Sequence, residues 1–410
     1  MGNCTNNNKR RMRIFSDDIY NISLPYDDIV FTRYLYIKDE VKLALRCSIL
    51  LKSDDAIFWA YELYWSGFVK ELVDTLWSIY YDHFATLNPS YEQYFLKKQK
   101  EFIVDYMENE FQCDNRFVSA IVQDFLIRPF NTDVFMMRII CDVFEIGDED
   151  TSTPKWSQWF QDKNYRSIGY YLLNGHFKGS YLELYKNLLT EFEQQGFTIK
   201  DKKKQETLFV KVSCNERAVK LEIILFAKIM SIFATNQGLN KGRNFYIIVD
   251  PSEVVQYETI ESSGLLKPYN VLKVAAAHNI NGLRLLHLFK LNRHKYSEKD
   301  LKTMYREKWL YHASFSPIWR IRLHEGKGWP IYANLTVGFS NTDCEEMFYS
   351  KYGLEPDEQP QYVQDKSIGA IALTDADYNW VHFEAQFGEK SLIRISLDEL
   401  EELNAEPIHL

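Results

Sequence analysis

A succession of amphipathic segments with helical periodicity fills residues 36–146 and constrains the fold of this chain more than any other feature. In the first segment, residues 38–52, apolar side chains recur three or four positions apart and so share one face of a helix. The same spacing predicts helices over residues 56–66, 69–84, 91–109, 115–128 and 132–145. Because short connections set neighbouring helices antiparallel, the sequence predicts an N-terminal helical bundle or short helical array.

Residues that favour helix ends stand between these segments. Ser53, Asp54 and Asp55 suit the start of the second helix, where a side-chain oxygen accepts an otherwise unpaired N–H group. Gly67 suits the left-handed conformation that commonly ends a helix. The whole chain of 410 residues has only 17 Gly and 11 Pro. A turn-rich β fold needs these residues at many corners, so the composition also favours helices.

The rest of the chain predicts a mainly α protein with a mixed α+β C-terminal region. Helical spacing resumes over residues 156–195, and residues 200–205 are interpreted as a charged break. β-branched and aromatic residues predict a strand over 245–249. Further predicted helices span 270–277, 283–291, 298–312 and 343–351, and further predicted strands span 333–339 and 368–373.

The predicted domains follow these breaks in the pattern. Residues 147–154 are polar and acidic and end in Pro, which is typical of a linker. The predicted divisions are a disordered basic tail and lead-in over 1–30, a helical domain over 31–147, a helical segment over 155–200, a mixed and mainly helical domain over 207–330, and an acidic α+β region over 331–410.

No local motif for catalysis, phosphate binding or metal binding is present. The chain lacks a Gly-x4-Gly-Lys loop, a Gly-x-Gly-x-x-Gly loop, a Gly-x-Ser-x-Gly elbow and a His-Glu-x-x-His helix. Its six cysteines are scattered and form no Cys-x-x-Cys pair, which is typical of thiols in a reducing compartment. We therefore expect no enzyme activity, no cofactor and no metal site. The alternative is an enzyme of unrecognised type, with a site assembled from distant residues.

Positive charge is concentrated in residues 284–329, although the whole chain has a net charge of −9. Aromatic residues, namely Trp309, Tyr311, Phe315 and Trp319, interleave with the basic ones. Lys and Arg neutralise phosphates, and aromatic rings stack on unpaired bases. The segment therefore predicts a nucleic-acid-binding face made by Arg284, Lys290, Arg293, Lys295, Lys302, Arg306, Lys308, Arg320 and Arg322. The alternative is internal pairing with residues 340–410, which hold sixteen acids against four bases.

The first residues, Met1-Gly2-Asn3-Cys4, suggest lipidation. Gly2 becomes a myristoylation acceptor once Met1 is removed, although Asn6 stands where the usual pattern has Ser or Thr. One acyl chain binds membranes weakly, so palmitoylation of Cys4 is the expected second signal. The alternatives are a disordered tail or a basic nuclear-localisation patch over residues 9–13. The most apolar helix, residues 221–234, is shorter than the roughly 20 residues that span a bilayer, and is interpreted as a core helix.

Four segments together resemble an uncharacterised protein family of nucleocytoplasmic large DNA viruses. They are Tyr34–Lys42, Asp55–Phe68, Ser316–Arg320 and Lys351–Pro360. The resemblance implies viral origin and helical architecture, and it carries over no site, because the family has no established activity. A second, local resemblance of residues 41–90 to the helical collar of clamp-loader-type ATPases implies helix-mediated assembly without an ATPase engine.

Taken together, these features predict a non-enzymatic viral interaction or scaffolding protein that acts in the infected cell or the virion. Aromatic residues on the early helices, namely Tyr61, Tyr64, Trp65 and Trp77, are expected to form a packed core or a partner surface. The alternative function is a nucleic-acid-associated factor in viral replication, transcription or packaging. Expected partners are viral or host proteins, nucleic acid, and a membrane only if the N-terminus is lipidated. The expected location is the viral factory in the host cytoplasm or the virion, with the nucleus as an alternative. The first 150 residues are expected to leave no preformed chamber.

Overall fold

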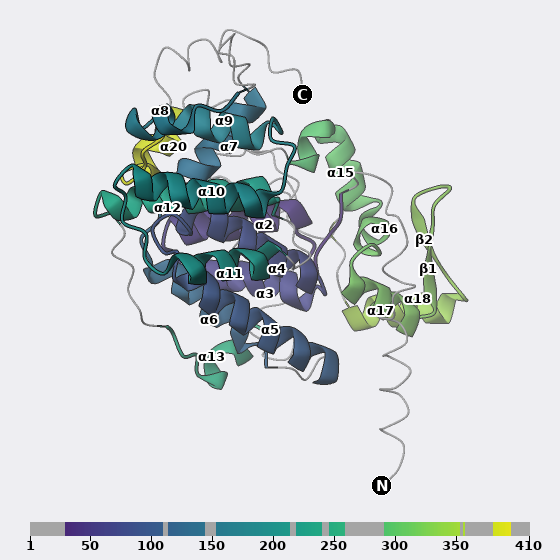
Figure 1. Ribbon diagram of the computed structural model, residues 1–410. Coiled ribbons are helices and arrows are strands. Elements are labelled where there is room, and N and C mark those ends of the chain that lie inside the picture. Colours follow the sequence, from purple (N-terminus) through teal and green to yellow (C-terminus); the bar gives the residue numbers. More distant parts are fainter. Residues whose placement is uncertain are drawn as a thin grey trace. The chain divides into compact units, whose positions relative to one another are not determined.

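The computed structural model describes residues 29–109, 114–143, 153–213, 219–239, 246–258, 291–352, 356 and 380–394. The protein is mostly helical, with a small two-stranded antiparallel sheet in its C-terminal region, which confirms the predicted fold class (Figure 1). None of the helices in these ranges is long and apolar enough to cross a membrane. Residues 1–28 of the predicted tail and lead-in, the strand over 368–373, the helix over 270–277 and residues 283–290 of the helix over 283–291 lie outside the described residues.

The chain divides into two compact units, each built from three separate stretches. Unit 1 comprises residues 1–44, 61–69 and 256–374, and unit 2 comprises residues 45–60, 70–255 and 375–410. Helices α2 (Lys38–Leu50) and α3 (Asp55–Trp65) contribute one end to each unit. These units differ from the predicted sequential domains, because residues distant in sequence pack together.

Unit 2 is a stack of helices with an aromatic core. Its elements are α4 (Val69–Ile79), η1 (Tyr80–Phe84), α5 (Tyr91–Asn109), α6 (Arg116–Ile127), α7 (Asp133–Val143), α8 (Trp156–Gln161), α9 (Tyr165–Leu173), α10 (Tyr181–Gln194), α11 (Lys202–Ser213), α12 (Leu221–Asn236), α13 (Pro251–Val255) and α20 (Trp380–Phe387). Helix α10 packs beside both α11 and α12, as Figure 1 also shows. Helix α12 is apolar on all sides and is almost wholly buried, which confirms the predicted core helix.

The predicted helix over residues 69–84 changes its hydrogen-bonding pattern partway along. The α-helix α4 ends at Ile79, and the π-helical turn η1 continues it with five buried side chains. Rings of both α4 and η1 stack on neighbouring helices. Trp77 stacks on Phe95 at a centroid distance of 3.9 Å, and Phe84 stacks on Phe125 at 4.6 Å. Of the predicted core or partner residues, Trp77 thus belongs to the core of unit 2.

Unit 1 holds helical turns and the sheet. Its remaining elements are η4 (Asn292–Lys295), α15 (Glu298–Arg306), α16 (Trp309–Ala313), α17 (Pro317–Glu325), β1 (Gly328–Ile331), β2 (Thr336–Phe339) and α18 (Thr342–Tyr352). The strands pair antiparallel, with Trp329 opposite Gly338. Tyr61 and Tyr64 are buried in this unit and Trp65 is half-buried, so the two tyrosines also form core and not partner surface.

Residues 316–319 join the two distant stretches of unit 1. Ser316 caps the N-terminus of α17, and Pro317 occupies its first turn. A Cβ atom at Gly67 would lie 2.5 Å from the Cβ of Pro317, so only glycine allows this approach. The buried Trp319 donates its indole N–H to the carbonyl oxygen of Thr32 at 2.9 Å. This contact holds the N-terminal stretch against α17.

A buried charged network organises the centre of unit 2. Asp82 is 1% exposed and lies 2.7 Å from the guanidinium groups of both Arg46 and Arg138. Burial raises the pKa of Asp82, but the positive charges of Arg138 and Arg46 outweigh burial and hold that pKa well below its usual range. Arg46 also donates to Nε2 of the buried His83 at 3.2 Å. Since arginine can only donate, Nε2 is an acceptor and the His83 ring is neutral.

This network predicts sensitivity to acid. Burial, reinforced by the charge of Arg46, lowers the pKa of His83 to about 3, whereas an unfolded histidine has a pKa of about 6.5. Below pH 6.5 the unfolded chain therefore binds one more proton at this residue than the folded chain. The free energy of unfolding should fall by about 2 kcal/mol between pH 7 and pH 5 through His83 alone. Urea denaturation at several pH values measures this loss.

The matched variant is His83→Gln, whose amide oxygen can accept from Arg46 but does not titrate. Its free energy of unfolding should fall by about 2 kcal/mol less than that of the wild type over the same pH range. Equal losses in the two proteins would show that His83 does not stay neutral in the folded state.

Candidate functional site

A wide groove lies between helices α5 and α11 of unit 2. Its volume is about 1120 Å³. Lys97 and Lys100 come from α5, and four further lysines come from the N-terminal turns and the end of α11. The lining residues are Ser90, Gln93, Tyr94, Leu96, Lys97, Lys100, Glu101, Asp201, Lys202, Lys203, Lys204, Thr207, Leu208, Lys211 and Tyr246.

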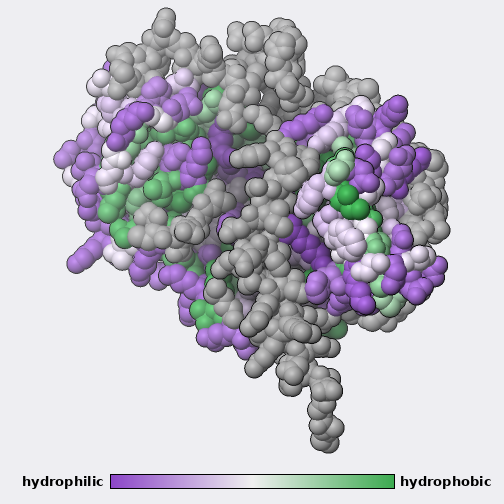
Figure 2. Space-filling model, turned by 90° about the vertical axis from the view of Figure 1, so that its right-hand side faces the viewer, coloured by the Kyte–Doolittle hydropathy of each residue, from purple (hydrophilic) through white to green (hydrophobic). Residues whose placement is uncertain are grey.

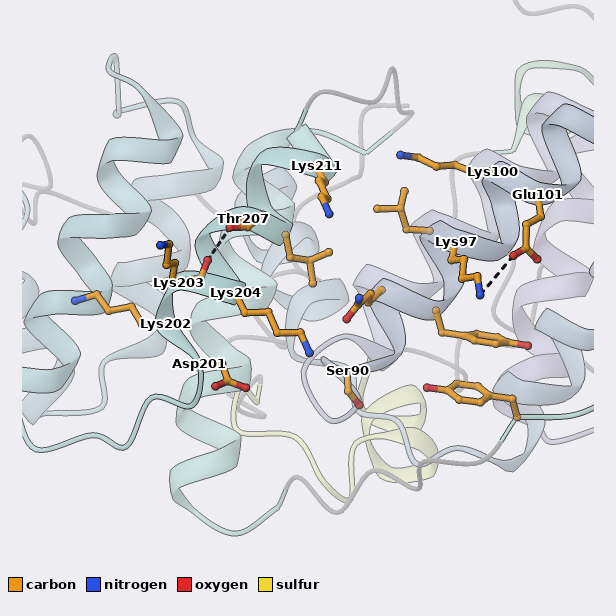
Figure 3. Close-up of a pocket in the computed structure, with 15 residues that line it drawn as sticks. Ser90, Lys97, Lys100, Glu101, Asp201, Lys202, Lys203, Lys204, Thr207 and Lys211 are labelled. Carbon is orange, nitrogen blue, oxygen red and sulfur yellow. Dashed lines mark hydrogen bonds and ion pairs between the residues drawn. The ribbon is translucent and has the colours of Figure 1, made fainter.

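The lysines differ in direction, as Figure 3 shows. Lys204 extends from α11 toward α5, Lys100 extends from α5 toward α11, and Lys211 points into the space between the helices. Lys202 extends the other way, where its ammonium group meets Glu193 at 2.7 Å. Lys97 lies 3.7 Å from Glu101. Lys100, Lys204 and Lys211 are therefore the cations that converge on the groove.

The groove is strongly positive. Six lysines and two carboxylates line it, which gives a formal charge of +4. Among the described residues, the structure shows no ion pair for the exposed side chains of Lys100, Lys204 and Lys211. Like charges that gather without counterions repel one another, so an anion that enters the groove relieves this repulsion.

The start of α11 adds to the positive potential. The first turn of α11 holds lysines and no acid, although the N-terminus of a helix carries a partial positive charge that favours acids. Tertiary contacts hold the helix in place despite this. Phe209 and Val212 are buried, and Gln205 accepts a hydrogen bond from the hydroxyl of Tyr185 at 3.0 Å. Local sequence thus opposes the helix start, whereas packing imposes it.

Two tyrosines line the same groove. The rings of Tyr94 and Tyr246 stack at a centroid distance of 3.8 Å with 15° between their planes. Burial raises the pKa of Tyr94 to about 12, so its hydroxyl stays protonated. Tyr246 is 39% exposed. The groove therefore combines cations with an aromatic surface.

The predicted basic face over residues 284–329 is divided by the structure. Arg284 and Lys290 lie outside the described residues. Arg293 is 5% exposed and forms an ion pair with the buried Glu40. Arg322 is buried, with its guanidinium 4.5 Å from the ring centre of Trp319. These two arginines lie in the interior of unit 1, where they are not exposed to a phosphate backbone.

The other predicted basic residues that the structure describes are more exposed than Arg293 and Arg322. Lys295 is exposed, whereas Lys302, Arg306, Lys308 and Arg320 are half-buried. Arg320 donates to the carbonyl oxygen of Ser314 at 3.1 Å. A hollow of about 560 Å³ on α15 brings Lys302 and Arg306 together, and its lining residues are Ser297, Lys299, Lys302, Thr303, Arg306 and Glu307.

The aromatic part of that prediction has a structural role. Trp309, Tyr311, Phe315 and Trp319 are all at most 5% exposed, so they form the core of unit 1 and present no face to a base. The predicted pairing with residues 340–410 falls mostly outside the described residues. Gly2 and Cys4, the predicted lipidation sites, also lie outside them.

Sequence reasoning missed the groove between α5 and α11. The run of three lysines at residues 202–204 is a signal for it, but the sequence pattern there predicts only a charged break over residues 200–205. The first 150 residues are expected to leave no preformed chamber, but residues 90–101 form one wall of this groove. In the described part of the chain, no three His, Cys, Asp or Glu residues gather into a group that could hold a metal ion.

The fold and the groove define a helical protein with a basic, aromatic-lined surface site. No family model, curated protein or solved structure matches the chain. The resemblance to a family of large DNA viruses stays a prediction.

Proposed function

We propose that this chain is a non-enzymatic binding protein that associates with nucleic acid through the groove between α5 and α11. The observation that supports this function is the convergence of Lys100, Lys204 and Lys211 on one groove, where none of the described acidic residues forms an ion pair with them. A phosphate backbone supplies the counterions, and the release of condensed salt ions drives binding. The predicted nucleic-acid-associated role is retained, with its main site moved from residues 284–329 to this groove.

The charge balance of the chain favours a local site. The net charge is −9, whereas the groove has a formal charge of +4. An acidic surface repels a polyanion, so binding is expected to concentrate where the sign is reversed. The only carboxylates among the lining residues are Glu101 and Asp201, and Glu101 is engaged with Lys97 and Lys98. The groove is thus better suited to holding an anion than to acid–base chemistry.

Charge reversal in the groove tests this function. The double variant Lys204→Glu and Lys211→Glu should bind a fluorescent oligonucleotide about 10- to 100-fold more weakly at low salt than the wild type. Because two phosphate contacts are lost, the slope of log affinity against log salt should decrease by about 2. Fluorescence anisotropy over a salt series measures both quantities.

The matched control is Lys155→Glu with Lys178→Glu. Both lysines are exposed, belong to unit 2 and lie outside the groove. This control changes the net charge by the same amount as the groove variant, so it measures the general effect of charge on binding. It should bind the oligonucleotide within about 2-fold of the wild type. Equal weakening in the two double variants, or no binding by the wild type at low salt, would refute the proposed site.

A protein-interaction or scaffolding role is the second candidate, and the hairpin β1–β2 favours it. Trp329 and Tyr332 are 49% and 52% exposed, and such aromatic residues often dominate protein interfaces. On the face drawn in Figure 2, hydrophobic side chains gather in patches among hydrophilic ones. A photo-reactive residue placed at Trp329 should trap one defined protein if this role is correct, and nothing above background if it is not.

A further inference from the structure

The aromatic pair in the groove has a fixed orientation. The backbone N–H of Ile247 donates to the carboxylate of Asp124 at 3.0 Å, which anchors the residue next to Tyr246. The guanidinium of Arg128 lies 4.3 Å from the ring centre of Tyr91 and 5.5 Å from that of Tyr246. The position of Tyr246 is thus set by side chains of α5 and α6 before any ligand binds.

Such preorganisation favours a stacking ligand. A ring that is already ordered loses little conformational entropy on binding. Tyr246 keeps 39% of its surface exposed while it is held against Tyr94. Lys97 and Lys100 follow Tyr94 on the same helix, at spacings of three and six residues, so the aromatic surface and the cations belong to one continuous site.

We infer that the groove selects single-stranded over double-stranded nucleic acid, with an unpaired base on the surface formed by Tyr94 and Tyr246. This inference rests on the proposed function. In a duplex the bases are paired and stacked inside, so a duplex offers phosphates to the lysines but no base to the tyrosines. A single strand offers both, and each base that stacks on an aromatic ring adds substantially to affinity.

Removal of one ring tests the inference. The variants are Tyr246→Ala, which removes the ring, and Tyr246→Phe, which keeps it. The probes are a thymidine homopolymer and a duplex with the same number of phosphates. Wild type should bind the single strand more tightly than the duplex. Tyr246→Ala should weaken single-strand binding at least about 5-fold and leave duplex binding unchanged, whereas Tyr246→Phe should bind both probes like the wild type.

The outcomes separate this inference from the proposed function. If neither probe binds at low salt, the proposed function fails. If both probes bind, the lysine reversals weaken both, and Tyr246→Ala changes neither, the function stands and the single-strand inference is overturned. Equal weakening of both probes by Tyr246→Ala overturns it too. An inorganic polyphosphate of equal charge is the third probe. If it displaces the labelled homopolymer as effectively as the unlabelled homopolymer does, stacking contributes nothing and the inference is again overturned.

Discussion

Replacement of Asp82 by asparagine is expected to lower the free energy of unfolding by about 3–5 kcal/mol. The Asp82 carboxylate is fully buried and balances Arg46, whose side chain is 13% exposed, and Arg138, whose side chain is 39% exposed, so the desolvated partner is chiefly Arg46. The amide of asparagine carries no charge, so the arginines lose their counterion at the centre of unit 2. Removal of one partner of a buried ion pair is costly because the remaining charge stays desolvated. Urea denaturation near neutral pH measures the change.

The control is Asp74→Asn on the neighbouring helix α4. Asp74 pairs with Lys70 at 2.7 Å, but the side chain of Lys70 is 77% exposed. A surface pair of this kind contributes at most about 1 kcal/mol. If Asp82→Asn costs no more than Asp74→Asn, the two arginines find other partners, and the network does not organise unit 2.

The second large effect is expected in unit 1. Trp319→Ala should lower the free energy of unfolding by about 3–5 kcal/mol, because it opens a cavity among packed rings. Trp319 is fully buried and packs against Trp309 at a centroid distance of 5.4 Å. The substitution also leaves the carbonyl oxygen of Thr32 without the indole N–H that donates to it. Chemical denaturation, followed by circular dichroism, measures the loss.

The control makes the same chemical change at Trp329, which is 49% exposed on the hairpin. Trp329→Ala should cost less than about 1 kcal/mol, since most surface substitutions have small effects. If both substitutions cost the same, Trp319 is not the contact that joins the separate stretches of unit 1.

Two of the segments that carry the predicted family resemblance have packing roles in the structure. In the segment Ser316–Arg320, Ser316 caps α17, Pro317 approaches Gly67, and Trp319 fills the core. In the segment Asp55–Phe68, Tyr61 and Leu63 are fully buried. Residues of these segments thus have packing roles, and neither segment provides a residue that lines the groove.

Helices were predictable wherever the apolar spacing was regular. The predicted helix over 91–109 has the bounds of α5, and the predicted helix over 38–52 differs from α2 only at its end. The predicted break over 200–205 is confirmed at residues 200 and 201 and is wrong from Lys202, where α11 begins, because the lysines of its first turn oppose the helix dipole and favour a break. Contacts with α10 hold the start of that helix, since Lys202 pairs with Glu193 and Gln205 accepts from Tyr185.

The predicted strand over 245–249 illustrates another limit. Residues 246–250 form no strand or helix, and the N–H of Ile247 bonds to the side chain of Asp124 instead of to a strand. Whether a segment with high β propensity forms a strand depends on a partner strand, and the local sequence does not identify that partner. The same segment places Tyr246 in the groove.

The sequence by itself determined most of the helical segments and which face of each is apolar, because helical periodicity is a local property. The tertiary structure decided which charges face solvent. It placed Arg293 beside Glu40, some 250 residues away along the chain, and it brought Lys100 of α5 opposite Lys204 of α11. Whether a charged side chain is buried in an ion pair or exposed to solvent depends on the residues that surround it in the folded protein, and these come from elsewhere in the chain.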